Sequence, residues 1–192
     1  MRAAPLAAAV GLAVLALAGC GGGKSGGGGT TAARAVAADA VVRTSEGTFT
    51  IRLDVADSPH TVASFEQLAQ KGFYDGLDFH RIVPGFVIQG GDPNGDGTGG
   101  PGYTTVDRPP ADTQYVRGVV AMAKRADEAA GTAGSQFFVV TGADIGLPPD
   151  YAVLGKVVSG MATVRKIGTL GDPQTEQPTR KVTIETISID ET

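Results

Sequence analysis

The chain has 192 residues, of which 42% are apolar and 19% charged, and its formal net charge at pH 7 is −4. This mild acidity argues against a nucleic-acid binder, because such proteins normally carry a basic stripe. The single cysteine excludes both an internal disulfide framework and a cysteine-based zinc site.

The first segment has the layout of a secretory signal. Arg2 precedes an apolar run over residues 6–18 that is rich in Ala, Leu and Val, too short for the roughly 20 residues that span a membrane. The run ends in Leu17-Ala18-Gly19-Cys20, which resembles the bacterial lipobox. The resemblance implies that residues 1–19 are removed and that Cys20 receives lipid. An ordinary signal peptide followed by a buried free thiol is the alternative.

Residues 20–38 follow as the lipidated cysteine and a tether. They contain two runs of glycine and show no periodic apolar face, a composition typical of a flexible linker. The folded domain is therefore expected over residues 39–192, which leaves enough chain for one hydrophobic core.

Short strands and two helices alternate through this domain. Strands are expected at 41–44 and 48–53 as a hairpin, and a helix at 59–70, where Pro59 follows a capping serine and Gly72 ends the helix. A second helix is expected at 161–167. Further strands are expected at 79–82, 86–89, 119–123, 136–140, 153–158 and 182–189. Many short strands with glycine-rich corners favour a closed antiparallel barrel over a parallel sheet.

Two loop motifs suggest ligands that their context excludes. The loop from Asp92 to Gly97 matches the first half of a calcium-binding EF-hand loop, but Tyr103 stands where a bidentate glutamate is needed. The glycines from Gly95 to Gly100 fit a dinucleotide-binding pattern, which should open a helix. Pro101 and Gly102 follow instead, so both stretches are interpreted as one ordered irregular loop.

Nucleophilic and metal-assisted catalysis are also poorly supported. Ser135 lies between Gly134 and Gln136, without the strand–turn–helix setting of a nucleophile elbow. The only histidines, His60 and His80, have few candidate partners for a shared metal. No metal site is predicted.

Two stretches instead combine apolar and polar side chains in an uncommon way. In the stretch over 79–92, a Pro-Gly turn separates Arg81 from Phe86 and Gln89, and a cationic guanidinium beside an aromatic ring is costly to bury without a purpose. In the stretch over 134–140, Phe137 and Phe138 are adjacent, so they point to opposite faces of a strand. One should enter the core and the other a surface groove.

Together these stretches resemble the cyclophilin-type peptidyl-prolyl cis-trans isomerases. The resemblance extends over most of residues 41–189 and includes the Phe-His-Arg and Ser-Gln-Phe-Phe blocks in the family's order. It implies a mainly β fold, a cyclophilin-like closed eight-stranded antiparallel β-barrel with two capping α-helices and a site on its outer surface. It further implies isomerisation of X-Pro bonds with no cofactor and no metal.

The resemblance also assigns roles to individual residues. Arg81 matches the catalytic arginine, and Gln89 the glutamine that holds the substrate carbonyl. Gln136 matches a supporting residue, and Ala123 with Lys124 the segment whose backbone pairs with substrate. The proline pocket corresponds to Phe86, Val87, Phe138, Leu147 and Tyr151.

Several positions depart from the family's pattern. Gly146 stands just before Leu147, where well-known eukaryotic members have tryptophan, and Tyr151 replaces a histidine. Val87 and Lys124 stand where methionine and asparagine are common. Weak cyclosporin binding is expected, because the missing indole removes a large contact and a hydrogen-bond donor.

The expected partners are proline-containing peptides and unfolded exported proteins, with no nucleic acid. The protein is expected to be a monomer held by its lipid on the extracytoplasmic face of the cell membrane, or in a periplasm. Two other functions remain open: a non-catalytic proline-peptide-binding chaperone on the same barrel, and a purely structural cell-envelope lipoprotein.

Overall fold

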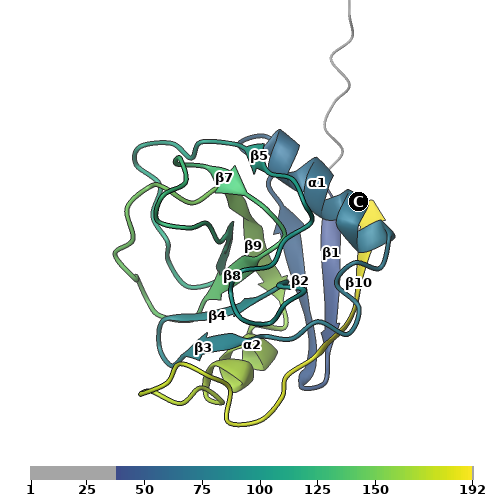
Figure 1. The fold of residues 1–192 in the computed structure, drawn as a ribbon, viewed down its shortest axis with the longest axis vertical. Coiled ribbons are helices and arrows are strands. Elements are labelled where there is room, and N and C mark those ends of the chain that lie inside the picture. Colours follow the sequence, from purple (N-terminus) through teal and green to yellow (C-terminus); the bar gives the residue numbers. More distant parts are fainter. Residues whose placement is uncertain (1–37, 192) are drawn as a thin grey trace, which may run out of the picture. The chain divides into compact units, whose positions relative to one another are not determined.

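The structure is a computed structural model that describes residues 38–191 (Figure 1). The expected signal peptide, Cys20 and nearly all of the tether lie outside these residues. The first strand begins at Ala38, one residue before the expected start of the domain. The strands are β1 (Ala38–Thr44), β2 (Gly47–Leu53), β3 (Arg81–Val83), β4 (Val87–Gly90), β5 (Thr105–Val106), β6 (Val119–Met122), β7 (Thr132–Ala133), β8 (Phe137–Val140), β9 (Val153–Ser159) and β10 (Ile184–Glu191), and the helices are α1 (Pro59–Gln70) and α2 (Met161–Gly168).

Eight strands form one antiparallel sheet in the order β10-β1-β2-β9-β6-β8-β4-β3. The edge strands β10 and β3 meet through the chain that precedes them: the Phe79 amide donates to the Val182 carbonyl over 2.9 Å and the Gly76 amide to the Ile184 carbonyl over 2.8 Å. The predicted mainly β, eight-stranded antiparallel fold with two helices is confirmed.

Each helix covers the sheet with one apolar face. In α1, Val62, Phe65 and Leu68 are buried at helical spacing. Pro59 occupies the first turn as expected, where its missing N–H costs nothing, but the Ser58 side chain makes no capping hydrogen bond. Figure 1 places α1 beside the upper ends of β1 and β10, and α2 at the opposite end near β3.

A second, two-stranded sheet was not predicted. It pairs Thr105 of β5 with Ala133 of β7. Two-residue strands carry no hydrophobic periodicity, so only the folded chain brings them together. Within residues 38–191, neither helix is long and apolar enough to cross a membrane.

Alternating side chains divide the apolar residues between two clusters. Along β8, Phe137 and Val139 belong to the main core inside the sheet, whereas Phe138 and Val140 belong to a smaller cluster on its other face. The prediction that the adjacent phenylalanines point to opposite faces is confirmed. This second cluster underlies the candidate site.

Candidate active site

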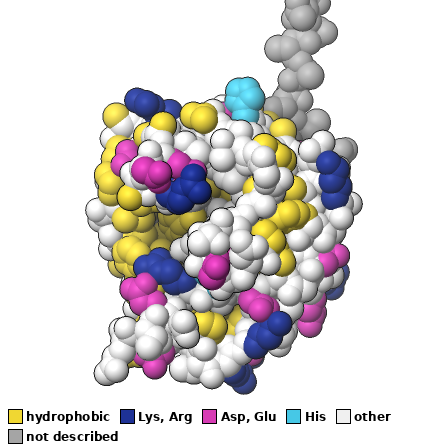
Figure 2. Space-filling model, viewed as in Figure 1, with side chains coloured by type: hydrophobic (Ala, Val, Ile, Leu, Met, Phe, Trp, Pro, Cys, Tyr) yellow, Lys and Arg dark blue, Asp and Glu magenta, His cyan; other side chains and the backbone are white. Residues whose placement is uncertain are grey.

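The smaller apolar cluster lies on the outer face of β4, β6 and β8. Val87, Ala121 and Phe138 form its floor, and all three are buried. The chain that follows β8 folds over this floor and contributes Leu147 and Tyr151. A hydrophobic hollow therefore opens on the outside of the sheet, away from the main core. On the face shown in Figure 2, hydrophobic side chains gather at the left and basic side chains border them.

Nine of the ten predicted substrate-contacting side chains surround this hollow, which has a volume of about 310 Å³. Its residues are Arg81, Phe86, Val87, Gln89, Ala123, Lys124, Phe138, Leu147 and Tyr151. They come from β3, β4, β8, the segment directly after β6 and the connections before β4 and after β8, so the site exists only in the folded sheet. The tenth, Gln136, lies in an adjoining cavity. The structure thus brings the predicted residues together, and their roles stay predictions.

Two aromatic rings of the hollow contact each other. Phe138 and Tyr151 meet edge to face, with ring centroids 5.5 Å apart, an arrangement that aromatic rings prefer. Behind them Tyr115 is almost fully buried. Its hydroxyl donates to the Tyr151 carbonyl over 2.7 Å and accepts the Tyr151 amide N–H over 2.9 Å. Burial raises the pKa of Tyr115 to about 12, so this hydroxyl keeps its proton.

Tyr115 is a site residue that the sequence did not reveal. It satisfies both backbone polar groups of Tyr151 and so fixes where that ring stands. An isolated tyrosine before a glycine-led strand gives no local signal of this role. The contact spans 36 positions in the chain.

Arg81 reaches the hollow from the first position of β3. Its Nε donates to Glu176 Oε2 over 2.7 Å, and its Nη1 donates to Gln89 Oε1 over 3.4 Å. Arg81 and Gln89 are cross-strand partners in the β3–β4 hairpin, which is why their side chains share one face. The Pro84-Gly85 turn that joins these strands was predicted from the sequence, whereas the contact with Glu176 was not.

A chain of amides continues from Gln89. Its Nε2 donates to Gln136 Oε1 over 3.1 Å, and Gln136 Nε2 donates to the carbonyls of Gly97 and Gly99 over 3.0 and 2.9 Å. These hydrogen bonds define the orientation of both side-chain amides, that of Gln89 and that of Gln136. Gln89 is left with a fixed position beside the hollow.

The loop that supplies the two glycine carbonyls is organised by Asp92. This buried carboxylate accepts the backbone N–H groups of Asn94, Asp96 and Gly97. A Cβ at Gly99 would lie 2.1 Å from Asp92 Oδ1, so the loop has no room for a side chain there. The loop that resembled half of a calcium site thus forms a frame for Gln136.

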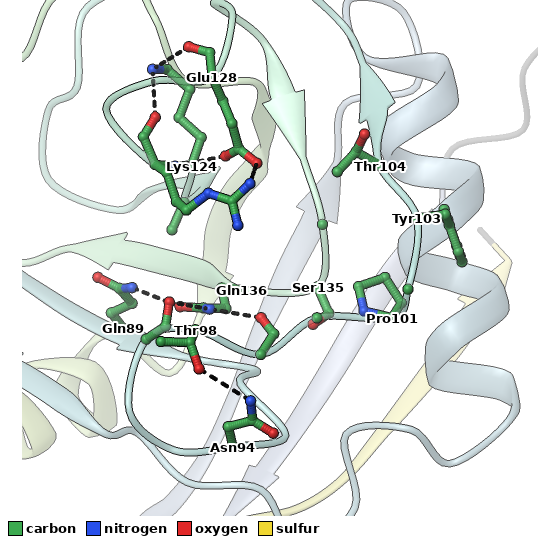
Figure 3. Close-up of a pocket in the computed structure, with 17 residues that line it drawn as sticks. Gln89, Asn94, Thr98, Pro101, Tyr103, Thr104, Lys124, Glu128, Ser135 and Gln136 are labelled. Carbon is green, nitrogen blue, oxygen red and sulfur yellow. Dashed lines mark hydrogen bonds and ion pairs between the residues drawn. The ribbon is translucent and has the colours of Figure 1, made fainter.

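A second cavity of about 530 Å³ adjoins the hollow and shares Gln89, Ala123 and Lys124 with it. Figure 3 shows Gln136 at its centre and Lys124 with Glu128 on one side. Lys124 Nζ donates to the Glu128 carbonyl over 3.0 Å and lies 5.7 Å from the Tyr151 ring centroid. Lys124 therefore stands between the two cavities.

Ala123 forms the ridge between these cavities. Its amide N–H already donates to the Gln136 carbonyl over 2.8 Å. This N–H is therefore not available to a bound peptide. At Ala123 the predicted backbone pairing with substrate is limited to the carbonyl.

The side chains around the hollow limit its chemistry. Among residues 38–191, those that line it include no carboxylate, imidazole or thiol, and no group of three or more His, Cys, Asp or Glu side chains in this part of the chain could hold a metal ion. What the hollow offers is an apolar pocket, a permanent positive charge with several N–H donors, and a fixed amide. These groups can bind and polarise a neutral ligand.

Comparison with known proteins finds relatives in both sequence and fold. A family model described as cyclophilin type peptidyl-prolyl cis-trans isomerase/CLD matches residues 40–189. Peptidyl-prolyl cis-trans isomerase B of Bacillus subtilis (strain 168) is 45% identical over 120 residues, which cover 62% of this chain and 81% of that protein. Peptidyl-prolyl cis-trans isomerase-like 1 of Aspergillus oryzae is 35% identical over 153 residues, with 78% and 93% covered.

Solved structures superpose on this chain over most of its length. The crystal structure of a Cryptosporidium parvum cyclophilin type peptidyl-prolyl cis-trans isomerase superposes with a TM-score of 0.74 at 28% identity, covering 81% of this chain and 99% of that one. A structure described as the same protein in the presence of the dipeptide Ala-Pro superposes with a TM-score of 0.73, covering 80% of this chain.

Proposed function

Because this chain belongs to the cyclophilin-type peptidyl-prolyl cis-trans isomerase family, its reaction is rotation about the bond that precedes proline, and we propose that Arg81 and the adjoining apolar hollow perform it. The observation that carries this proposal is the placement of one guanidinium beside a pocket lined by Phe86, Phe138 and Leu147. A proline ring is apolar and neutral, so such a pocket can hold it. A related protein was crystallised in the presence of Ala-Pro, which supports proline peptides as ligands.

The reaction needs stabilisation of a twisted amide and no bond cleavage. Amide resonance imposes a barrier of about 18–20 kcal/mol. When the amide twists, the prolyl nitrogen regains its lone pair and becomes a better hydrogen-bond acceptor. The Nη groups of Arg81 donate to that nitrogen more strongly in the twisted state than in the planar one. Only this difference between the two states accelerates the rotation.

The remaining groups hold the peptide while its bond rotates. Gln89 holds a substrate carbonyl, and its own orientation is set by Gln136. The peptide chain crosses the ridge at Ala123, whose carbonyl accepts a backbone N–H. The proline then enters the first cavity, and the residues before it extend toward the second. Anchoring both sides of the bond restricts motion to the rotation itself.

A protease-coupled assay on an Ala-Pro tetrapeptide tests the role of Arg81. Arg81→Ala is expected to lower kcat/KM by at least about 100-fold, because removing a preorganised donor to a transition state costs this much. Equal rates for the variant and the wild type would remove Arg81 from the mechanism. A wild-type rate no faster than buffer would favour a non-catalytic binder of proline peptides.

The site of action is a second part of the proposal. The Leu17-Ala18-Gly19-Cys20 motif after a short apolar run supports export and lipid attachment at Cys20. Two or three acyl chains anchor a protein stably, so the isomerase acts as a tethered monomer on the extracytoplasmic face of a membrane, or in a periplasm. Exported chains fold there, and uncatalysed prolyl isomerisation takes about 10–100 s.

Lipid attachment can be measured directly. The full chain, expressed in a lipoprotein-processing bacterium, is expected to partition into detergent and to yield an N-terminal Cys20 peptide with the mass of a diacylglyceryl adduct. Cys20→Ser should partition into the aqueous phase. A wild-type protein with an unmodified Cys20 would refute the anchor and leave the isomerase proposal untouched.

A further inference from the structure

One contact of Arg81 comes from a distant loop. Glu176 lies between α2 and β10, 95 positions from Arg81, and its Oε2 accepts the Arg81 Nε–H at 2.7 Å. The two side chains are 36% and 45% exposed, and exposed ion pairs by themselves contribute little to stability. The pair is unusual in the backbone conformation of Glu176.

Glu176 is held in an unfavourable backbone conformation. Its φ is 59°, and it is the only non-glycine residue between positions 38 and 191 with a positive φ. A glutamate there is strained, because its Cβ crowds the backbone in the left-handed region. Residues kept in such conformations are over-represented at functional sites, where the surrounding structure enforces them.

The loop that enforces this conformation is joined to β3 itself. The Glu176 carbonyl accepts the amide N–H of Ile82, the residue after Arg81, over 2.8 Å, and the Glu176 amide donates to the Asp172 carbonyl over 2.8 Å. A Cβ at Gly171 would lie 2.1 Å from the Ile82 carbonyl. In Figure 1 the segment between α2 and β10 passes beside β3. One residue thus holds the backbone of β3 through its carbonyl and the Arg81 side chain through its carboxylate.

The carboxylate also selects which N–H groups of Arg81 stay available. A guanidinium has one N–H on Nε and the others on its two Nη nitrogens. Glu176 occupies the Nε–H and Gln89 contacts Nη1 from another strand. Two acceptors on different elements define the guanidinium plane. The free N–H groups that remain are all on the Nη nitrogens, beside the hollow.

From these contacts we infer that Glu176 is a positioning residue for catalysis: its carboxylate orients Arg81 so that the Nη groups face the prolyl nitrogen. The inference rests on the proposed role of Arg81. Without Glu176, the hydrogen bond that the Arg81 side chain keeps within residues 38–191 is the 3.4 Å contact with Gln89, which is long for a hydrogen bond. The guanidinium then samples other rotamers, and the fraction of molecules in the productive geometry falls.

The test compares Glu176→Gly, Glu176→Gln and wild type. Glycine tolerates the positive φ, so Glu176→Gly removes the carboxylate without retaining strain. We expect it to lower kcat by about 5–20-fold with KM within about twofold, and to leave the thermal midpoint unchanged or higher. Glu176→Gln keeps an acceptor for the Nε–H and should lose about threefold or less in kcat. Exchange NMR on a proline peptide at several concentrations separates kcat from KM.

A matched control uses another ion-paired glutamate. Glu46 contacts Lys166 and Arg180, the latter from the same connection between α2 and β10, but does not line the hollow. Glu46→Gln should therefore leave kcat unchanged. The Arg81 Nε–H signal gives a direct readout: its exchange with water should be slow in wild type and Glu46→Gln and fast in Glu176→Gly.

The two proposals fail separately. If Arg81→Ala retains wild-type rates, the proposed role of Arg81 is wrong. If Arg81→Ala is impaired but Glu176→Gly keeps the wild-type kcat, with or without a change in KM, the positioning inference alone is overturned. In the Arg81→Ala background, Glu176→Gly should cause no further loss, because the two residues act through one another.

Discussion

Replacing Tyr115 with phenylalanine removes the one oxygen atom that holds the Tyr151 backbone in place. That oxygen makes two hydrogen bonds, of 2.7 and 2.9 Å, to the Tyr151 carbonyl and amide. The ring itself stays buried against Phe138, so packing is preserved. The variant therefore isolates the contribution of the hydroxyl.

The expected cost follows from these two bonds. Each intramolecular hydrogen bond contributes about 1 kcal/mol, and a buried partner left unpaired raises this. We expect the free energy of unfolding to fall by about 2–3 kcal/mol. For a domain of about 150 residues this lowers the thermal midpoint by roughly 4–12 °C. Tyr151 should also become mobile, which raises KM for proline peptides.

Urea denaturation and the protease-coupled assay measure the two effects. Tyr103→Phe is the matched control, because the Tyr103 side chain is exposed and its hydroxyl forms a single hydrogen bond within the described residues, to Ser64 Oγ at 2.9 Å. It should change stability by less than about 0.5 kcal/mol. The reasoning fails if Tyr115→Phe is as stable as this control.

Three further predictions concern the hollow and the response to acid. Phe138→Ala should raise KM for proline peptides by at least about tenfold, measured by exchange NMR, because it removes the floor of the pocket and its ring contact with Tyr151. Burial lowers the pKa of His80. The contribution of this neutral side chain to the free energy of unfolding is therefore complete above about pH 6.5 and is lost as pH falls through the lowered pKa. In His80→Gln the urea midpoint should depend less on pH between about pH 7 and 5 than in the wild type. Calorimetry should show weak cyclosporin binding, since Gly146 offers no indole at the edge of the pocket, and a submicromolar Kd would contradict this.

Much of the fold could be predicted because its signals are local. Alternation along 136–140 separates Phe137 from Phe138, and helical spacing over 59–70 marks the buried face of α1. Strand bounds were less accurate: β3 begins at Arg81, two residues later than expected. A short strand has few residues to define its ends, and its partners set where pairing begins.

Arg81, Phe86, Gln89 and Phe138 could be assigned to the site from the sequence, because they occur in two compact stretches that resemble the cyclophilin family. The sequence did not show that the predicted site residues divide between two cavities. Gln136 directly precedes β8 and lies two positions from Phe138. Its side-chain amide nevertheless turns to the carbonyls of Gly97 and Gly99. Hydrogen bonds to Asp92 shape the loop that contains these glycines. Nothing in the order of the residues indicates that its carbonyls accept the side-chain N–H groups of Gln136.

Local periodicity indicated a barrel, and the resemblance of short stretches to the cyclophilin family indicated an arginine beside an apolar pocket, because both signals lie within a few neighbouring positions. The contacts that orient the pocket join positions far apart in the chain: 36 for Tyr115 with Tyr151, 47 for Gln89 with Gln136 and 95 for Arg81 with Glu176. Such contacts form only after the sheet has brought separate loops to one face. Tertiary structure alone therefore decided how the guanidinium is held and which of its nitrogens contact Glu176 and Gln89.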